Sequence, residues 1–389
     1  MKLLSFFQKI DLFIVVIALY IVTVSVNLQV PLYSEYAKAN NYGNGFTAIV
    51  FSAYIGGLLF ILTFLGGASD YFGRKPVITG GLTASLLATL SISIFPNINI
   101  LLISRILQGV GVGLCVGSAT AYLSENMQFS ESSKAPYFAS LATSFGFATG
   151  ALFTSLALLY KFSLVPISYW IILLLNFLCL IIVIFKVKNH TFIKSRNVMR
   201  LPLFLKGTMI FNLAIMLAWS VTGIIISMVS LQLASSNLSQ WIGVVLFSAI
   251  GTGTFVQPLA RKFKPHKSLK IGSLLILTGY TLLLIGIYFT SVFLVILGSI
   301  IAGSSCYGFT YLGGLAAINL AANDSEKSRA VSGFFLFAYI GFSLPSIIVG
   351  FISDFIGINY SLSLFGIVVL FSSLVLFYSL KKQAARSNL

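Results

Sequence analysis

The stretch GGASDYFGRKPV, residues 66–77, places an acid and two bases between two long apolar runs. Asp70 is one of only eight Asp and Glu residues in a chain of 389 residues. Arg74 and Lys75 follow it closely, and Arg74 can pair with the Asp70 carboxylate. Glycines on both sides of Asp70 permit a tight turn. The stretch therefore predicts a short polar turn between two helices.

The composition around this turn indicates a membrane protein. The chain is 58% hydrophobic and 8% charged, and its mean hydropathy is +1.01. A soluble domain is about 25% charged, and a helix that crosses a bilayer needs about 20 mostly apolar residues. The apolar runs are too long for barrel strands and lack their alternation. The sequence predicts an all-α membrane protein with twelve transmembrane helices, at approximately 11–36, 46–66, 76–95, 99–122, 135–159, 166–186, 204–232, 240–260, 270–290, 292–319, 329–352 and 359–380.

The basic connection at 187–203 divides the chain into two six-helix halves, residues 1–186 and 204–389. With the N-terminus inside, 21 of the 24 Lys and Arg residues fall on the cytoplasmic side. This is the positive-inside bias of membrane proteins. We therefore expect a multi-pass protein of the plasma membrane (the bacterial inner membrane) with both termini in the cytoplasm.

The same charge distribution limits the classes of partner. The net charge of +16 is explained by topology and by attraction to anionic membrane lipids, without a nucleic acid. The sequence has no GxxxxGK[ST] loop for ATP and no His, Cys, Asp and Glu cluster with metal-ligand spacing. The three cysteines fall inside apolar runs and resemble small hydrophobic residues. We expect a monomer that is not an enzyme and needs no cofactor or metal.

Two motifs point to a known family. Residues 66–75 follow the pattern G-x-x-x-D-x-x-G-R-K, and the run at 99–122 contains R-x-x-Q-G-x-G from Arg105. With twelve spans and a central loop, the whole chain resembles the major facilitator superfamily. The resemblance implies a conformational latch on the cytoplasmic side, completed by an acid at the inner end of the fourth run. The residues it assigns to this latch are Gly66, Asp70, Gly73, Arg74, Lys75 and Glu125. The alternative is a plain helix cap at Asp70 beside bases that only set topology.

Arg105 is a charged residue within a predicted span. A guanidinium at such a depth costs ~2.5–3.5 kcal/mol on insertion scales. Either it extends to the outer headgroups, or it faces the central cavity and pairs with a carboxylate or a substrate anion. The glycines that follow it, from Gly109 to Gly117, favour close packing of this helix inside the bundle.

Polar and aromatic residues within the first, fourth, seventh and tenth runs are candidates for substrate binding, because these helices line the cavity in the family that the chain resembles. They are Asn27, Gln29, Gln108, Asn212, Trp219, Tyr307 and Tyr311. The alternative for each is packing or hydrogen bonding between helices. Since deep charge is scarce, the predicted pocket suits amphiphilic or neutral ligands.

We therefore predict a secondary active transporter that moves a small molecule by alternating access. The stretch VPLYSEY at 30–36 is similar to drug/proton antiporters, which favours efflux coupled to proton entry. The stretch GFATGALFTS at 146–155 departs from them, with Ala151 in the place of a proline. Uptake or export of a specific metabolite, such as a sugar, an amino-acid derivative or a siderophore-like molecule, remains the alternative, also as a facilitator. A non-transporting membrane sensor is a more distant one.

Coupling to protons requires a titratable group. Glu35, at the outer end of the first run, is the predicted carrier, together with Arg105. A neighbouring arginine lowers the pKa of a carboxyl, and desolvation raises it. The alternative is a solvated acid beside Lys38.

Overall fold

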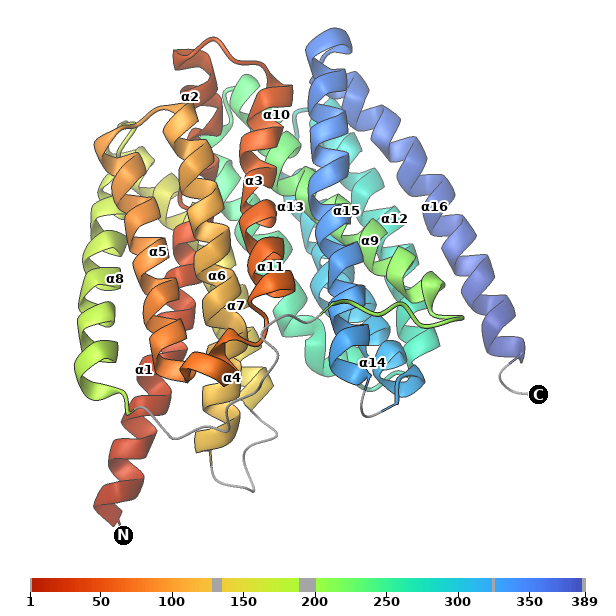
Figure 1. Ribbon diagram of the computed structural model, residues 1–389. Helices are drawn as coiled ribbons and strands as arrows, with labels where there is room; N and C mark the ends of the chain where they lie inside the picture. Colours follow the sequence, from red (N-terminus) through yellow and green to blue (C-terminus); the bar gives the residue numbers. More distant parts are fainter. Residues whose placement is uncertain (1, 128–134, 189–200, 324–325, 387–389) are drawn as a thin grey trace. The chain divides into compact units, whose positions relative to one another are not determined.

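The computed structural model describes residues 2–127, 135–188, 201–323 and 326–386. Within these ranges every regular element is a helix, and no strand is present (Figure 1). The described residues contain twelve segments long and apolar enough to cross a membrane, so the prediction of an all-α protein with twelve spans is confirmed. The segments are Ile10–Ala39, Asn44–Phe64, Arg74–Ile94, Ile98–Asn126, Ala135–Tyr160, Ile167–Lys186, Met209–Ser235, Ser239–Ala260, Pro265–Tyr288, Val292–Ala321, Lys327–Ile356 and Ile358–Gln383.

Nine of the sixteen α-helices form or dominate a span by themselves. They are α3 (Asn44–Phe64), α5 (Arg74–Ile94), α6 (Ile98–Asn126), α7 (Ala135–Tyr160), α8 (Ile167–Lys186), α11 (Ile242–Ala260), α12 (Pro265–Tyr288), α15 (Lys327–Ile356) and α16 (Ile358–Arg386). A short helix, α4 (Ala68–Phe72), precedes α5, and a 3₁₀ turn, η4 (Ser239–Trp241), precedes α11.

Three spans are built from several segments. The first joins α1 (Lys2–Asn27), η1 (Val30–Leu32) and α2 (Tyr33–Ala39). The seventh and tenth contain π-helical turns, which are frequent at functional sites. The seventh span consists of α9 (Met209–Ile224), the π turn η3 (Ile225–Val229) and α10 (Ser230–Ser235). The tenth consists of α13 (Val292–Gly303), the π turn η5 (Ser304–Phe309) and α14 (Thr310–Ala321).

The seventh span begins later than the sequence indicates. The apolar run predicts a helix from residue 204, whereas α9 begins at Met209. Gly207 has a φ of 82°, a conformation that a right-handed helix does not contain, so the helix forms only after it. The apolar run starts with Phe204 and Leu205, but hydrophobicity carries no information about the backbone at Gly207.

Contacts divide the chain into two compact units. Unit 1 contains Met1–Gln29 and Ala53–Arg200, and unit 2 contains Val30–Ser52 and Leu201–Leu389. The helix α3 therefore begins in unit 2 and ends in unit 1. Most of the predicted central loop, residues 189–200, lies outside the described residues, and the predicted boundaries at 187 and 203 stay a prediction.

Within unit 1, α6 packs closely on its neighbours. A β-carbon on Gly109 would collide with the Tyr54 carbonyl of α3, and one on Gly111 would lie 2.9 Å from the Gly81 carbonyl of α5. Glycine allows such backbone approach between membrane helices. The close packing expected of this helix is present at these positions, whereas Gly117 has no atom within 4 Å of an added β-carbon.

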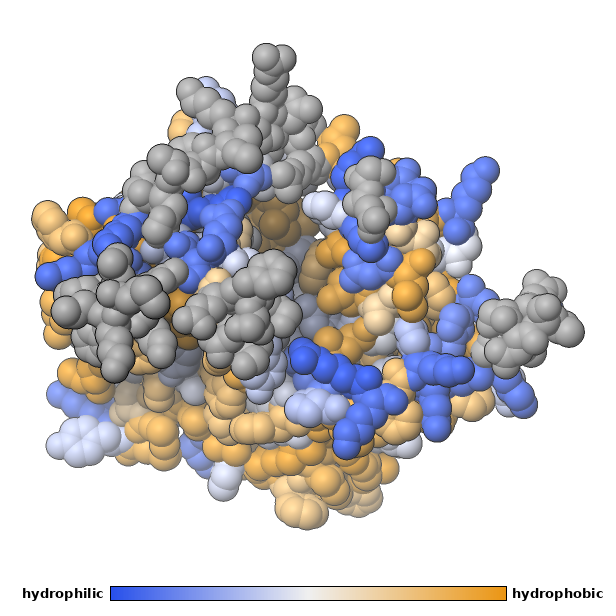
Figure 2. Space-filling view, turned by 90° about the horizontal axis from the view of Figure 1, so that it is seen from below, coloured by the Kyte–Doolittle hydropathy of each residue, from blue (hydrophilic) through white to orange (hydrophobic). Residues whose placement is uncertain are grey.

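Large apolar side chains cover the outside of several helices. Phe371 and Val375 on α16 and Leu174 on α8 are exposed. Hydrophilic residues gather on the face seen from below, and hydrophobic residues cover much of its margin (Figure 2). An apolar surface of this extent is unusual for a water-soluble protein and suits a lipid environment.

Candidate functional site

The turn at 66–75 takes part in an ion-pair network in unit 1. Arg74 Nη1 lies 2.6 Å from Asp70 Oδ1, and Arg74 Nη2 lies 2.6 Å from Glu125 Oε1. Nε of the same arginine also donates to Glu125 at 3.1 Å, and Nη1 donates to Ser69 Oγ at 2.6 Å. The structure thus brings together three residues assigned to the latch. Their role in conformational change stays a prediction.

Gly73 sets the geometry of this network. It is the C-cap of α4 and the N-cap of α5, with φ 99° and ψ 157°. This region is essentially restricted to glycine. The reversal at Gly73 makes Arg74 the first residue of α5 and leaves it four residues after Asp70.

Gly66 and Lys75, which are also assigned to the latch, take no part in the ion pairs found among the described residues. Gly66 lies in an exposed turn before α4. The side chain of Lys75 is half-buried, and no ion pair with Lys75 is found within the described part of the chain. The contacts therefore concentrate on Arg74.

Arg105 lies inside unit 1 and is 1% exposed. Its Nη1 donates to the Val26 carbonyl of α1 at 2.5 Å and to Gln108 Oε1 at 3.0 Å. Its guanidinium also lies 5.0 Å from the centre of the Tyr54 ring, a cation–π distance. The alternative in which Arg105 extends to the lipid headgroups is wrong, because the side chain is enclosed between α1, α3 and α6.

Gln29 and Gln108 extend this buried polar group. Both are 0% exposed, and Gln108 Nε2 donates to the Ser25 carbonyl at 3.0 Å. With its amide oriented to satisfy its neighbours, Gln29 accepts from Gln108 Nε2 at 2.9 Å and donates to the Val26 carbonyl at 3.1 Å. We call Gln29, Arg105 and Gln108 the buried polar cluster.

The buried polar cluster continues across unit 1 through residues that were not among the predicted site residues. Ser25 Oγ and Ser85 Oγ lie 2.7 Å apart, and Asn176 Nδ2 donates to Ser85 at 3.2 Å. All three side chains are completely buried. A lone asparagine within the apolar run at 166–186 is the signal that could have indicated a polar contact here.

Asn27 packs between two helices of unit 1. Its Nδ2 donates to the Phe147 carbonyl of α7 at 2.8 Å, and the Asn27 residue is 3% exposed. Seven residues before Asn27 on α1, the Tyr20 hydroxyl lies 3.0 Å from Thr149 Oγ1, which also belongs to α7. In this structure the polar face of α1 bonds across to α7, which is the packing alternative for Asn27.

Unit 2 gathers three of the substrate-site candidates with rings that the prediction omitted. The ring of Trp219 on α9 lies 6.1 Å from that of Tyr307 in η5 and 5.3 Å from that of Tyr339 on α15. Tyr311 on α14 lies 6.1 Å from Phe335. Further pairs join Phe335 to Tyr339 and Trp219 to Phe342. The aromatic cluster of unit 2 consists of Trp219, Tyr307, Tyr311, Phe335, Tyr339 and Phe342.

Three rings of this aromatic cluster lie on elements without charged residues, and the other three lie on α15, which contains Lys327, Arg329 and Asp354. The helices α9 and α14 and the turn η5 contain no Asp, Glu, Lys or Arg. Trp219 Nε1 is buried without a hydrogen-bond partner among the described residues. Asn212, seven residues earlier on α9, is 2% exposed, and its Oδ1 is likewise unpartnered within that part of the chain. The cluster can offer ring faces and a few neutral polar atoms to a ligand.

Glu35 lies on α2 in unit 2. Its carboxylate is 3.2 Å from Lys38 Nζ and accepts from Ser34 Oγ at 3.3 Å. The Glu35 side chain is 34% exposed, so it retains contact with solvent. These contacts agree with the alternative of a solvated acid beside Lys38, and the predicted coupling of Glu35 with Arg105 stays a prediction.

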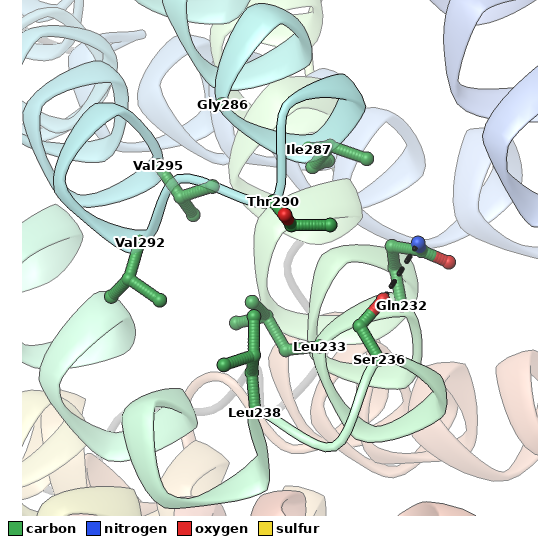
Figure 3. A pocket seen from close by; sticks show the side chains of 9 residues that line it. All are labelled: Gln232, Leu233, Ser236, Leu238, Gly286, Ile287, Thr290, Val292 and Val295. Carbon is green, nitrogen blue, oxygen red and sulfur yellow. Dashed lines mark hydrogen bonds between the residues drawn. The ribbon is translucent and has the colours of Figure 1, made fainter.

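A small pocket in unit 2 contains none of the predicted site residues. It lies where α10 ends and α12 leads into α13, and Gln232 Nε2 donates to Ser236 Oγ at 3.3 Å on its wall (Figure 3). The rest of the lining is mainly apolar: Leu233, Leu238, Gly286, Ile287, Thr290, Val292 and Val295. The described residues contain no group of three His, Cys, Asp or Glu side chains able to hold a metal ion.

The fold and these motifs together define a polytopic membrane transporter of a known kind. The model of the Major Facilitator Superfamily matches residues 12–311 of this chain. The chain belongs to this superfamily. The assignment agrees with the resemblance carried by the turn at 66–75 and by the R-x-x-Q-G-x-G pattern.

Relatives of described function align over short segments. Multidrug resistance protein 2 of Bacillus subtilis (strain 168) is 28% identical over 143 residues, 37% of this chain and 36% of the relative. Multidrug resistance protein MdtL of Escherichia coli is 34% identical over 79 residues, 20% of each chain. Monosaccharide-sensing protein 2 of Arabidopsis thaliana is 31% identical over 128 residues, 32% of this chain and 16% of the relative. The alignments thus span well under two thirds of these relatives.

Solved structures support the fold over nearly the whole chain. A bacterial homolog to the human lysosomal transporter Spinster matches with a TM-score of 0.77 at 12% identity, covering 96% of this chain and 97% of that chain. The nucleoside transporter NupG matches with a TM-score of 0.74 at 13% identity, covering 96% and 99%. Family and fold indicate a multi-pass membrane protein of the Major Facilitator Superfamily.

Proposed function

We propose that this protein exports a small amphiphilic or neutral molecule by alternating access, with proton entry as the driving force. Alternating access exposes a substrate at the aromatic cluster of unit 2 to each side of the membrane in turn. The protein acts in the bacterial inner membrane as a monomer surrounded by lipid, with both termini in the cytoplasm.

The aromatic cluster is the observation that carries the substrate class. Six rings from three spans lie next to one another, and three of these rings lie on α9, η5 and α14, which contain no Asp, Glu, Lys or Arg. Ring faces attract flat apolar groups and, through their quadrupole, organic cations. A highly charged anion would find no counter-charge on α9, η5 or α14. Trp219 and Asn212 supply the neutral polar atoms that could orient a ligand.

The direction of transport is proposed from the relatives. Two of the relatives with short alignments are named multidrug resistance proteins. Export of foreign compounds would require the broad, mainly apolar recognition that the aromatic cluster supports. The positive-inside bias supports the proposed cytoplasmic location of the termini.

Proton coupling rests on Glu35 and the buried polar cluster. Glu35 is partly exposed, so it can exchange a proton with water, and its charge state affects the ion pair with Lys38. Arg105 donates to a backbone carbonyl and to an amide oxygen inside unit 1. We propose that protonation of Glu35 is one step of the transport cycle.

Reconstitution in liposomes tests transport and coupling together. Purified protein is given a lipophilic cationic dye, and dye flux is recorded with and without an imposed pH gradient, for wild type and Glu35→Gln. Gradient-driven flux in the wild type that is lost in Glu35→Gln supports the proposal. Equal gradient-driven flux in both proteins excludes Glu35 as the carrier, and a wild type that ignores the gradient excludes proton coupling.

The substrate site is tested with tryptophan variants. Trp219→Phe should raise the dye concentration for half-maximal flux by roughly three- to tenfold, because the loss of an indole contact costs on the order of 1 kcal/mol. Trp170→Phe is the matched control, since Trp170 lies exposed on α8 of unit 1. Equal behaviour of the two variants would remove the aromatic cluster from the substrate path.

Transport of a specific metabolite is the second candidate. The buried Asn212 Oδ1 without a partner is the observation that favours it, because a substrate hydroxyl or amine could satisfy that acceptor. Ala151, where the antiporter pattern has proline, points in the same direction. Profiling exported and imported metabolites in an expression host distinguishes the two candidates.

A further inference from the structure

The sequence of the turn at 66–73 is repeated near the end of the chain. Residues 66–73 read GGASDYFG, and residues 350–357 read GFISDFIG. Both follow G-x-x-S-D-x-x-G, with an aromatic residue directly after the aspartate. The first copy contains the turn after α3, the short helix α4 and Gly73, and leads into α5, whereas the second consists of the last turns of α15 and Gly357, and leads into α16. Nothing in the family resemblance or in the proposed function uses the second copy.

The backbone is repeated as well as the sequence. Gly357 has φ 83° and ψ 156°, and Gly73 has φ 99° and ψ 157°. Each glycine ends one helix and begins another. From the serine onward, both stretches are thus a helix end followed by a glycine with positive φ, and Asp354 occupies the position of Asp70.

The two aspartates differ in their partners. Asp354 accepts hydrogen bonds from the backbone N–H of Asn44 at 2.7 Å and from that of Gly45 at 2.9 Å. These N–H groups belong to the first turn of α3, where no intrahelical acceptor exists and the helix dipole is positive. We call these two bonds the Asp354 clamp.

The packing around the Asp354 clamp is close. A β-carbon on Gly43 would lie 2.7 Å from Asp354 Oδ1, and one on Gly45 would lie 2.6 Å from the Phe351 ring. A β-carbon on Gly350 would lie 2.8 Å from that of Ala48. The start of α3 and the end of α15 thus fit directly against each other (Figure 1).

The clamp holds a segment that continues into the other unit. Residues 30–52 pack with unit 2, whereas α3 from Ala53 onward packs with unit 1. Alternating access at this end of α3 requires Val30–Ser52 to separate from the rest of unit 2. Both hydrogen bonds of the clamp must break during that separation, and the Asp354 carboxylate must then be hydrated.

We propose that Asp354 is a second latch of the transport cycle, which holds the start of α3 against α15 and so keeps this end of the transporter closed. This proposal rests on the alternating access proposed above. The first turn begins two residues after α3 ends, whereas Asp354 binds where α3 begins. One 21-residue helix of about 30 Å thus has a G-x-x-S-D-x-x-G turn acting at each of its ends.

Cysteine accessibility measures this latch without a substrate. Ser52→Cys places a thiol at a position that is 7% exposed and packed within unit 2, where Ser52 Oγ donates to the Ser343 carbonyl at 3.3 Å. The native cysteines Cys115, Cys179 and Cys306 are buried and are replaced by alanine to remove background. The rate of labelling by a membrane-impermeant maleimide then reports separation of this segment.

Asp354→Ala in this background should raise the labelling rate by about three- to thirtyfold, the range expected for loss of a helix-capping side chain. Gly45→Ala should also raise it, because the added methyl displaces Phe351 and the Asp354 carboxylate. Asn359→Ala is the matched control, an exposed polar residue in the first turn of α16 that lies outside the clamp. It should leave the rate unchanged.

Two results would overturn the latch. One is an unchanged labelling rate in Asp354→Ala protein that elutes as a monodisperse species; the other is an equal rise in Asn359→Ala. If Asp354→Ala is not recovered from membranes, Asp354→Asn and Gly45→Ala decide the question by the same criterion. If the protein transports no dye but its labelling rate rises in Asp354→Ala, the latch is supported and the proposed transport is refuted. If the protein transports dye but its labelling rate is unchanged in Asp354→Ala, only the latch is refuted.

Discussion

The turns at 66–73 and 350–357 have the same spacing and the same glycine backbone, yet their aspartates bind different groups. Asp70 pairs with the guanidinium of Arg74, whereas Asp354 accepts two backbone N–H groups. The residue after the final glycine explains the difference. In the first turn it is Arg74, and in the second it is Ile358, which offers no charge.

This difference teaches how one local structure serves two kinds of contact. With an arginine four residues away, the aspartate joins a side-chain network inside unit 1. Without it, the same carboxylate is free to cap a helix that arrives from elsewhere in the sequence. The shared backbone fixes the position of the aspartate, and the residue after the final glycine determines which group the aspartate binds.

The largest effect is expected at the first turn. Asp70→Asn removes the negative charge opposite Arg74 and should lower transport by about tenfold or more, since bonds to charged groups contribute ~1.5–3 kcal/mol. Membrane insertion should remain normal. Flux in liposomes at matched protein amounts is the measurement, and normal flux in correctly inserted protein would contradict the latch role. Asp354→Asn keeps an acceptor oxygen and should lower flux less.

The shared backbone is tested by glycine substitutions. Gly73→Ala and Gly357→Ala should each cost about 1–2 kcal/mol, because both glycines have a positive φ that disfavours a β-carbon. The thermal midpoint of detergent-solubilised protein should fall for both. Gly56→Ala is the control, since Gly56 lies inside α3 with open space around it. Unequal losses at the two turns would break the structural equivalence.

The network of the first turn should show coupling that the second turn does not share. Arg74→Ala and Glu125→Gln, combined with Asp70→Asn, should be less than additive by about 0.5–1 kcal/mol in transport rate. Arg74→Ala combined with Asp354→Ala should be additive, because the two residues have no partner in common. A double-mutant cycle on dye flux measures both values. Coupling between Arg74 and Asp354 would join the two turns into one network.

The smallest effect is expected when Ile358, the residue that follows Gly357, is replaced. Ile358→Arg gives the second turn the spacing of Asp70 and Arg74, and the new guanidinium should compete for Asp354. An exposed pair of this kind contributes only ~0.3–0.5 kcal/mol, so labelling of Ser52→Cys should rise about twofold. Ile358→Leu should have no effect. A lower labelling rate in Ile358→Arg would mean that the arginine reinforces the clamp.

The sequence predicts those features that have a signature in residue type or spacing. Twelve apolar runs give twelve spans, because length and hydrophobicity are what the bilayer requires. The pairing of Asp70 with Arg74 follows from their separation of four residues across a turn. Glycine spacing in α6 similarly indicates the close approach of Gly109 to α3.

Contacts with backbone groups escape such reasoning. Arg105 binds the Val26 carbonyl, and Asp354 binds the N–H of Gly45, but every residue has a carbonyl and nearly every residue has an N–H. No residue type marks these acceptors and donors. The same holds for Asn27, whose partner is the Phe147 carbonyl, so its place between α1 and α7 could not be distinguished from one in the cavity.

The aromatic cluster was predicted only in part. Trp219, Tyr307 and Tyr311 were selected because of their helices, whereas Tyr339 and Phe342 lie on α15, which the family resemblance did not assign to the cavity. A chain with 35 phenylalanines and 17 tyrosines gives no signal that separates a ring in a cluster from a ring facing lipid. Tertiary packing decides between them.

The π-helical turns η3 and η5 have a consequence for how this protein can change over generations. A π turn contains one residue more than an α turn, so deleting one codon within Ser304–Phe309 restores a continuous α-helix. The wide turn then becomes an α turn that is one residue shorter, so the helix segments on its two sides keep nearly the same facing. Tyr311 would keep its direction relative to α13, and only the extra residue of the wide turn would be lost. Single-codon gains and losses at η3 and η5 are therefore a route by which relatives can add or remove a residue in these spans without turning the rest of the helix.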